Sequence, residues 1–131
     1  MKKTFLQPAN MHKPFSTYSL GLTVEGATRL VFCAGQVAAD KDGNLVGEGD
    51  FEVQAEQVVA NLKAVLAEAG ATISDVVKAT TFIVGREHAG AARELIRRTF
   101  DEANPPASTL CVLAGLADPR MLVEIEAIAV L

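Results

Sequence analysis

The chain has 131 residues, with 12 lysines and arginines against 16 aspartates and glutamates and a formal net charge of −4. This length predicts one domain, residues 1–131, large enough to fold without a disulfide or metal. The acidic balance argues against nucleic-acid binding as a main activity, because phosphate binding needs clustered lysine and arginine. The mean hydropathy of +0.25 is high for a small domain, which predicts burial of apolar surface against other subunits.

The sequence also predicts where the chain resides. Its longest uncharged stretch, Ala103–Ala117, is interrupted by two prolines, so no membrane span is expected. The N-terminus has lysines but no apolar run behind them, unlike a signal peptide. Cys33 and Cys111 show no disulfide pattern, which favours a reducing compartment and a cytoplasmic location.

Three strands are expected before the first helix. Thr4–Leu6 is the first candidate, and Leu20–Val24 and Arg29–Ala34 flank turn residues 25–28. This arrangement predicts a hairpin between the second and third strands. The Asp42-Gly43 step predicts a second tight turn with positive φ at the glycine.

The clearest helix signal covers Phe51–Ala69. Apolar residues recur there at spacings of three and four and predict one buried stripe, formed by Val58, Leu62, Val65, Leu66 and Ala69. Asp50 is the expected N-cap, and Gly70 stands where a helix commonly ends in a left-handed residue.

The second half of the chain alternates strand and helix. β-Branched residues predict a buried strand over Val76–Val84, and a helix is expected over Glu87–Phe100. Strands over Ser108–Ala114 and Met121–Leu131 complete the chain. The order β-β-β-α-β-α-β-β predicts an α+β domain, a mixed sheet with two helices on one face. We expect a trimer or dimer to cover the other face.

Two carboxylates interrupt the apolar last strand. Alternation places Glu124 and Glu126 on one face, with Cβ atoms roughly 7 Å apart. This face is either solvated and ion-paired, or one carboxylate lines a cleft and holds a water as general acid or base. His12 and His88 lack any recognised metal-ligand spacing, so no metal is expected. No phosphate-binding glycine loop is found either.

Alternation also divides the preceding strand. It sets Ala107, Thr109 and Cys111 on one face, and Ser108 with Leu110 on the other. The small polar groups of whichever face meets Glu124 are candidate ligand contacts.

Segments spread over nearly the whole chain carry a resemblance to a known family: Tyr18-Ser19, Val31–Gln36, Asp42-Gly43, Gln57–Leu66, Gly70-Ala71, Asp75–Thr80, Pro106–Thr109 and Leu122–Val130. They are similar to the reactive intermediate deaminase family, also called the YjgF/YER057c/UK114 family and often described as endoribonuclease L-PSP. The resemblance implies a chorismate-mutase-like fold and a homotrimer. In such a trimer the sheets close a central barrel, and ligand clefts lie between subunits.

The resemblance also implies a reaction and its residues. Active deaminases of the family hydrolyse enamine or imine intermediates, such as 2-aminoacrylate, to 2-oxo acids and ammonia without a cofactor. Glu124 matches the glutamate that orients the attacking water, and Tyr18 matches a tyrosine that covers the cleft. Gly35 and Gln36 match a substrate-binding pair, with Ala34 in place of the commoner serine.

The chain departs from the family at its substrate-binding arginine. Ala107 stands where the arginine is expected, followed by Ser108 and Thr109, so the chain resembles branches that lack this residue. An arginine suits a substrate carboxylate because it binds both oxygens. Arg93 is the favoured substitute and Arg120 the second candidate, unless both are merely exposed charges.

Three functions therefore remain open from the sequence. The first is a homotrimeric enzyme that hydrolyses a C–N bond in a small molecule, with Glu124 positioning water. The second is a non-catalytic trimer that binds a metabolite in the same cleft. The third is an endoribonuclease, which a net charge of −4 supports poorly.

Overall fold

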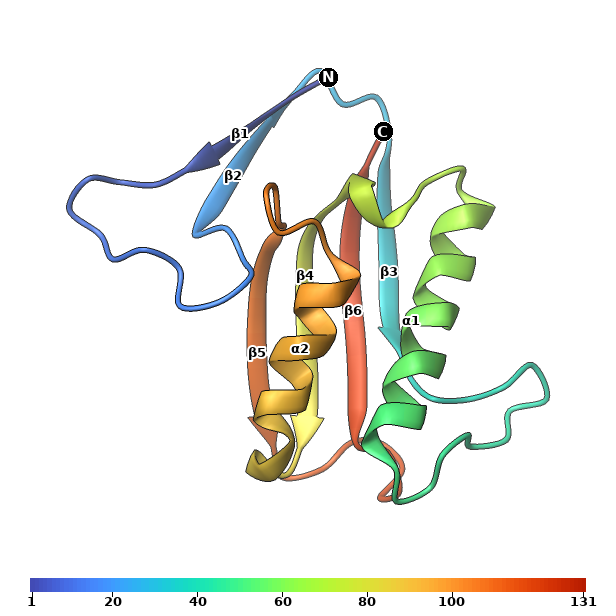
Figure 1. Cartoon of the computed structure of the whole chain (residues 1–131). Helices are drawn as coiled ribbons and strands as arrows, with labels where there is room; N and C mark the ends of the chain where they lie inside the picture. Colours follow the sequence, from blue (N-terminus) through green and yellow to red (C-terminus); the bar gives the residue numbers. More distant parts are fainter.

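Four strands form the main sheet of the computed structural model, which describes residues 1–131 (Figure 1). In spatial order they are β3 (Leu30–Gln36), β6 (Val123–Val130), β4 (Val76–Val84) and β5 (Ala107–Leu113). β6 runs antiparallel to both β3 and β4, whereas β4 and β5 are parallel. The predicted mixed sheet is confirmed, and its two outer strands are β3 and β5.

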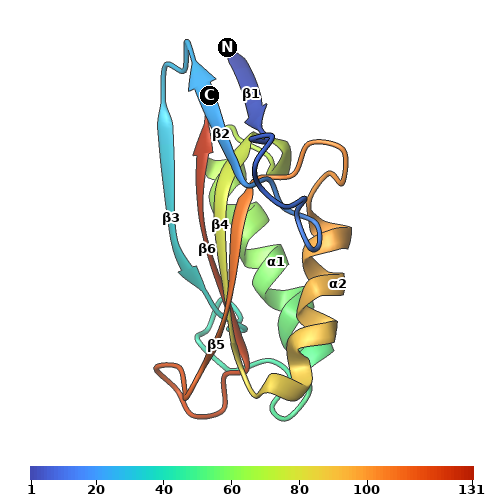
Figure 2. The ribbon, with the colours of Figure 1, turned by 90° about the vertical axis from the view of Figure 1, so that its left-hand side faces the viewer.

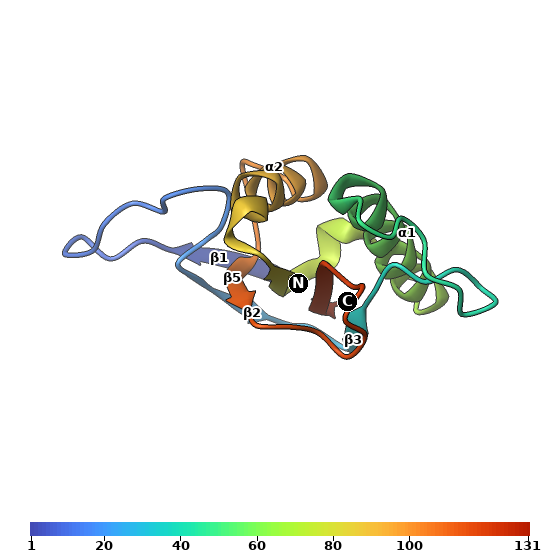
Figure 3. The same ribbon diagram turned by 90° about the horizontal axis from the view of Figure 1, so that it is seen from below.

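Both helices pack on one face of this sheet (Figure 3). The first, α1 (Phe51–Glu68), lies over β3 and β6, and the second, α2 (Ala89–Thr99), forms the crossover between the parallel strands β4 and β5. Short 3-10 turns, η1 (Ile73–Asp75) and η2 (Arg86–His88), precede β4 and α2. The core fills the space between helices and sheet with Val58, Leu62, Leu66, Ile83, Leu95, Val123 and Ile125, all at most 1% exposed.

Local signals set the ends of α1 as expected. The Asp50 side chain accepts a hydrogen bond from the Val53 backbone N–H at 3.1 Å, and Gly70 adopts φ +74° just beyond the last turn. One expected member of the buried stripe is wrong: Val65 is 38% exposed. The buried side chains of α1 form a line that includes Phe51, Ala55, Val58 and Leu62. Val65 lies at the edge of this line and is exposed to solvent.

The first two strands pair with each other instead of joining the main sheet. β1 (Lys2–Leu6) and β2 (Gly21–Glu25) form an antiparallel pair that projects beyond β5 (Figure 1). The predicted hairpin between β2 and β3 is therefore wrong. The backbone N–H groups of Thr28 and Arg29 both donate to the Leu131 carbonyl, at 2.7 and 3.0 Å, so the chain is tied to the C-terminus and β3 continues alongside β6.

The face of the main sheet opposite the helices has no covering layer (Figure 2). We call it the open face and define it by side chains of all four strands: Phe32, Ala34, Lys78, Thr80, Phe82, Ala107, Thr109, Cys111, Glu124, Glu126 and Ile128. Phe32 is 71% exposed, and Leu30 at the start of β3 is 59% exposed. None of the helices has the length and apolar character needed to cross a bilayer.

Candidate functional site

Glu124 projects from the open face. It lies opposite Phe82 of β4, and Glu126 lies opposite Thr80, so both carboxylates share this side of the sheet. The residues between and beside them, Val123 and Ile125, point into the core and are at most 1% exposed. The alternation read from the sequence is confirmed, and Glu124 is the less exposed of the two carboxylates.

Gly35 gives the Glu124 side chain its room. A Cβ atom at position 35 would lie 2.7 Å from Cδ and 2.9 Å from Cγ of Glu124 and would overlap its carboxylate oxygen. A register shift between Cys33 and Gln36 places Gly35 at this point of β3. The Gln36 side-chain amide donates to the Ala34 carbonyl at 3.0 Å. Four predicted site residues, Ala34, Gly35, Gln36 and Glu124, thus lie together.

The open face also carries Ala107, Thr109 and Cys111, and the same register adds a residue that sequence reasoning missed. Lys78 lies directly opposite Ala107 in the parallel β4–β5 pair. Its Nζ donates to the Thr109 hydroxyl at 2.9 Å. Only the pairing of β4 with β5 could have indicated this neighbour, and that pairing is a long-range contact. A hollow of about 510 Å³ lies beside it, lined among others by Phe32, Thr80 and Glu126.

The remaining predicted residues, Tyr18, Arg93 and Ser108, meet on the helix side of the sheet. They line a pocket of about 400 Å³ together with Phe15, Ser16, Thr17, Ile96 and Leu110. We call it the α2 pocket. Arg93 and Ile96 come from α2, and Ser108 and Leu110 from β5. Ser108 faces this pocket because it alternates with Ala107, which faces the other side.

Hydrogen bonds hold the Tyr18 loop against the start of β5. The Ser19 hydroxyl donates to the Pro105 carbonyl at 2.6 Å, and the Ser19 backbone N–H donates to the Pro106 carbonyl at 3.0 Å. The Tyr18 hydroxyl accepts from the Phe15 backbone N–H at 3.2 Å. Tyr18 thereby lies in the lining of the α2 pocket.

The arginines of the chain differ in whether a carboxylate neutralises them. Arg97 is ion-paired with Glu94 and Glu102, and Arg98 with Glu52. Arg120 Nη2 lies 2.8 Å from Asp118 Oδ2. Hydrogen bonds from the side chain and backbone of Arg120 lower the pKa of Asp118 to about 2. Arg93 makes no ion pair and no side-chain hydrogen bond, which leaves its guanidinium available to a ligand.

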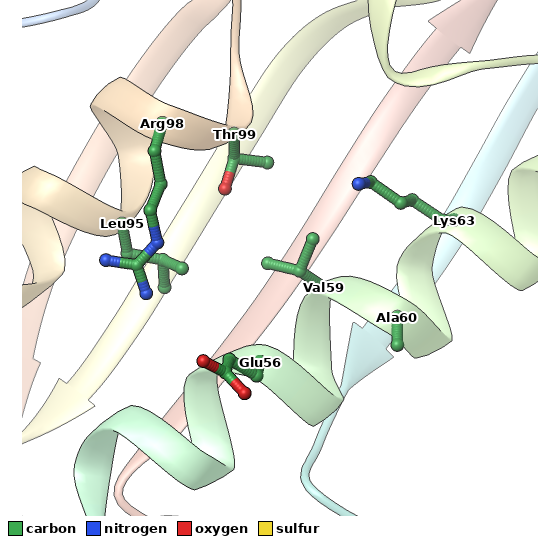
Figure 4. A pocket seen from close by; sticks show the side chains of 7 residues that line it. All are labelled: Glu56, Val59, Ala60, Lys63, Leu95, Arg98 and Thr99. Carbon is green, nitrogen blue, oxygen red and sulfur yellow. The ribbon is translucent and has the colours of Figure 1, made fainter.

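A further hollow separates the outer surfaces of α1 and α2. It measures about 370 Å³, and Val59, Leu95 and Glu56 are among the residues that line it. Figure 4 shows Arg98 and Lys63 on its opposite sides. It contains none of the predicted site residues, and its arginine is already paired with Glu52 at 3.0 Å.

The chemistry available to the chain is that of a carboxylate, hydroxyls and a free guanidinium. Glu124 can accept a proton from water, and Arg93 can bind an anion. Burial raises the pKa of the Cys33 thiol, which disfavours a nucleophilic thiolate. No three His, Cys, Asp or Glu side chains lie close enough together to hold a metal ion.

Comparison with known proteins places this geometry in a family. The sequence pattern of the family described as Endoribonuclease L-PSP matches residues 9–131. A RutC family protein of Synechocystis sp. is 38% identical over 132 residues, which cover 100% of this chain and 98% of the relative. A RutC family protein of Pyrococcus abyssi is 31% identical over 129 residues, 98% of each protein.

A solved structure agrees with the sequence comparison. The conserved Rid family protein YyfB from Yersinia pestis superimposes with a TM-score of 0.88 at 37% identity, and the match covers 100% of both chains. Sequence and structure are thus similar along essentially the whole length. The chain belongs to the Endoribonuclease L-PSP family, and its structural neighbours include proteins of the Rid family.

Proposed function

We propose that this protein hydrolyses the C–N bond of small enamine or imine intermediates in clefts between the subunits of a homotrimer. The observation that carries the proposal is the Glu124 carboxylate, which projects from β6 into space left free by Gly35. Membership of a family with RutC and RidA proteins supports the same chemistry. The proposed setting is the cytoplasm, where unpaired cysteines stay reduced.

Glu124 and Arg93 lie on opposite sides of the sheet within one chain, so one chain cannot apply both to the same ligand. We propose that an assembly does so at a junction between two subunits, and the edges of the sheet are available for such a junction. β3 and β5 are outer strands, and apart from one bridge between Ser19 and Ala107 their outer edges are unpaired. A head-to-tail ring of three chains places the β3 edge of one subunit beside the β5 edge of the next. The exposed Phe32 then becomes buried.

The proposed reaction needs only these side chains and water. Glu124 accepts a hydrogen bond from a water molecule and takes its proton as the oxygen attacks the imine carbon. Glu124 returns this proton to the imine nitrogen, which gives a carbinolamine with hydroxyl and amino groups on one carbon. Glu124 then takes the hydroxyl proton and passes it to the amino nitrogen, so that ammonia leaves as the carbonyl of a 2-oxo acid forms. Imine and water are thereby converted to 2-oxo acid and ammonia, with no oxidation or reduction.

The test compares ammonia release by the wild type, Glu124→Gln and Glu126→Gln, with 2-aminoacrylate generated in the assay. Removal of the general base should lower the rate about 100-fold or more. Glu126→Gln is the matched control, because Glu126 shares the strand and the open face. Equal rates in wild type and Glu124→Gln would refute the assignment. Absence of turnover together with saturable 2-oxo acid binding would favour a metabolite-binding protein.

Two further measurements test the assembly and the remaining activity. Sedimentation equilibrium should give three times the chain mass of 13.8 kDa, and a monomer would contradict the intersubunit cleft. Purified protein should not cleave RNA. RNA cleavage that disappears in Glu124→Gln would instead support an endoribonuclease.

A further inference from the structure

The hollow between the outer surfaces of α1 and α2 is a second place where a small molecule fits, and we call it the helix groove. It has a volume of about 370 Å³ and is lined by Glu56, Val59 and Lys63 of α1 and by Leu95, Arg98 and Thr99 of α2. Both helices lie on the face of the sheet opposite the open face (Figure 3). An assembly that buries the open face therefore leaves the helix groove accessible.

Two ionised groups in the helix groove have no partner within the chain. Lys63 and Glu56 take part in none of its ion pairs. The Lys63 amine points from α1 across the groove, and the Glu56 carboxylate lies nearer its other end (Figure 4). Arg98 is already paired with Glu52 at 3.0 Å. One free cation and one free anion therefore remain for a ligand.

The two free charges are too far apart to satisfy each other. Glu56 and Lys63 are separated by almost two turns of α1, so their Cα atoms lie about 10 Å apart. Opposite charges on one helix pair at about half this spacing. A ligand that satisfies both groups needs an ammonium at one end, for the Glu56 carboxylate, and a carboxylate at the other, for Lys63. The Thr99 hydroxyl faces the groove from α2 and can donate to the same carboxylate.

The groove is apolar between its charged ends. Val59 lies between Glu56 and Lys63 on α1, and Leu95 lines the groove from α2 (Figure 4). A methylene chain placed on this surface is removed from water, which favours binding. An α-amino acid carries both of its charges on one carbon and can therefore reach only one end of the groove.

We propose that the helix groove binds a zwitterion whose ammonium and carboxylate are separated by a short methylene chain, which is the chemistry of ω-amino acids. Glu56 binds the ammonium, Lys63 and Thr99 bind the carboxylate, and Val59 contacts the chain. The site shares no lining residue with the α2 pocket. Because its charges are exposed to water, the dissociation constant should be on the order of millimolar.

The experiment titrates the full-length protein with ω-amino acids of increasing length and follows the methyl signals of Val59 by NMR. The series is glycine, 4-aminobutanoate, 6-aminohexanoate and 8-aminooctanoate. Affinity should be highest at an intermediate length, because glycine cannot reach both charges and the longest chain must buckle between them. An affinity that is highest for glycine, or that rises steadily to the longest chain, would overturn the proposal, and so would the absence of saturable shifts.

Ligands with a single charge test the need for both ends. Hexanoate lacks the ammonium and hexylamine lacks the carboxylate, so each should bind about fivefold more weakly than 6-aminohexanoate. Equal binding of either molecule would show that one charge suffices and would refute a site for zwitterions.

Variants then assign each charge. Glu56→Gln should weaken the binding of 6-aminohexanoate about fivefold and leave that of hexanoate unchanged, and Lys63→Met should weaken 6-aminohexanoate but not hexylamine. Glu68→Gln and Lys41→Met are the matched controls, because both residues are exposed, lack ion pairs and lie outside the groove. Unchanged affinity in Glu56→Gln or Lys63→Met would contradict the assignment, and so would an equal loss in the controls.

A last comparison separates the helix groove from the proposed active site. Glu124→Gln and Arg93→Gln should bind 6-aminohexanoate as the wild type does. A loss of affinity in either variant would place the ligand outside the groove and refute the inference, whatever the outcome of the ammonia-release assay.

Discussion

The side-chain carboxylate of Glu124 occupies the space that a side chain at Gly35 would need. The two residues belong to neighbouring strands, β6 and β3, and their contact lies on the open face of the sheet. Position 35 requires a residue without a side chain, because even the methyl group of alanine would displace the proposed base.

Gly35→Ala should therefore lower activity at least about 10-fold, by moving Glu124 off its water. Overpacking should also lower the free energy of unfolding by about 1–3 kcal/mol. Gly115→Ala is the control, because a Cβ atom there meets nothing within 4 Å. Rate measurements combined with urea unfolding test both effects, and a Gly35→Ala enzyme as fast as the wild type would contradict the proposed role of the contact.

Gln54 joins α1 to the segment that leads into β6. Its side chain is fully buried, donates to the carbonyls of Gly47 and Arg120 at 3.0 and 2.9 Å, and accepts from Leu122 N–H at 2.8 Å. Gln54→Met leaves three backbone groups without partners and should lower the free energy of unfolding by about 3 kcal/mol. Gln57→Met, which removes one bond to Asn61, should cost less than about 1 kcal/mol in the same chemical denaturation experiment.

Thr81 is a buried polar residue that, unlike Gln54, makes no side-chain hydrogen bond. Its hydroxyl is buried in β4 without a hydrogen-bond partner. Thr81→Val replaces the hydroxyl with a methyl group of similar size and should raise the free energy of unfolding by about 1 kcal/mol. Thr23→Val on the exposed pair β1–β2 should change it by less than about 0.5 kcal/mol. Destabilisation by Thr81→Val would indicate that the hydroxyl is satisfied in solution.

The Asp118–Arg120 pair predicts a pH dependence. Side-chain and backbone hydrogen bonds from Arg120 lower the pKa of Asp118 to about 2. A carboxyl group with a lowered pKa stabilises the folded state above its ordinary pKa, and this contribution is lost as the pH falls toward 2. Carboxyl NMR should give an Asp118 midpoint about 2, and Arg120→Gln should raise it. Wild type and Arg120→Gln should become more alike in stability at low pH, and a constant difference would contradict the linkage.

The sequence predicted the elements well because their signals are local. The cap at Asp50, the glycine at position 70 and the β-branched run of β4 each act within a few residues. Strand pairing is a long-range property, and for that reason the β2–β3 hairpin was wrong while the strands themselves were confirmed. Val65 was misplaced because helical spacing defines a stripe but not its edge.

The candidate site was predictable only as a set of residues. Alternation separated Ala107 from Ser108, but only the packing of α2 on β5 shows that Ser108 shares a pocket with Arg93. Lys78 could not be recognised as a neighbour of Thr109 without the β4–β5 register. Such neighbours depend on contacts between elements, and no residue spacing in one strand encodes them.

The placement of Glu124 and Arg93 on opposite sides of one sheet predicts complementation between subunits that carry different substitutions. If each cleft takes its base from one subunit and its anion anchor from the next, two impaired variants can complement each other. Glu124→Gln and Arg93→Gln subunits, unfolded and refolded together in equal amounts, should recover about one quarter of the wild-type activity, because random assembly joins two intact half-sites with that frequency. Each variant refolded alone should keep only the residual activity of its substitution at substrate concentrations below saturation, so complementation can reveal the shared cleft without a bound ligand.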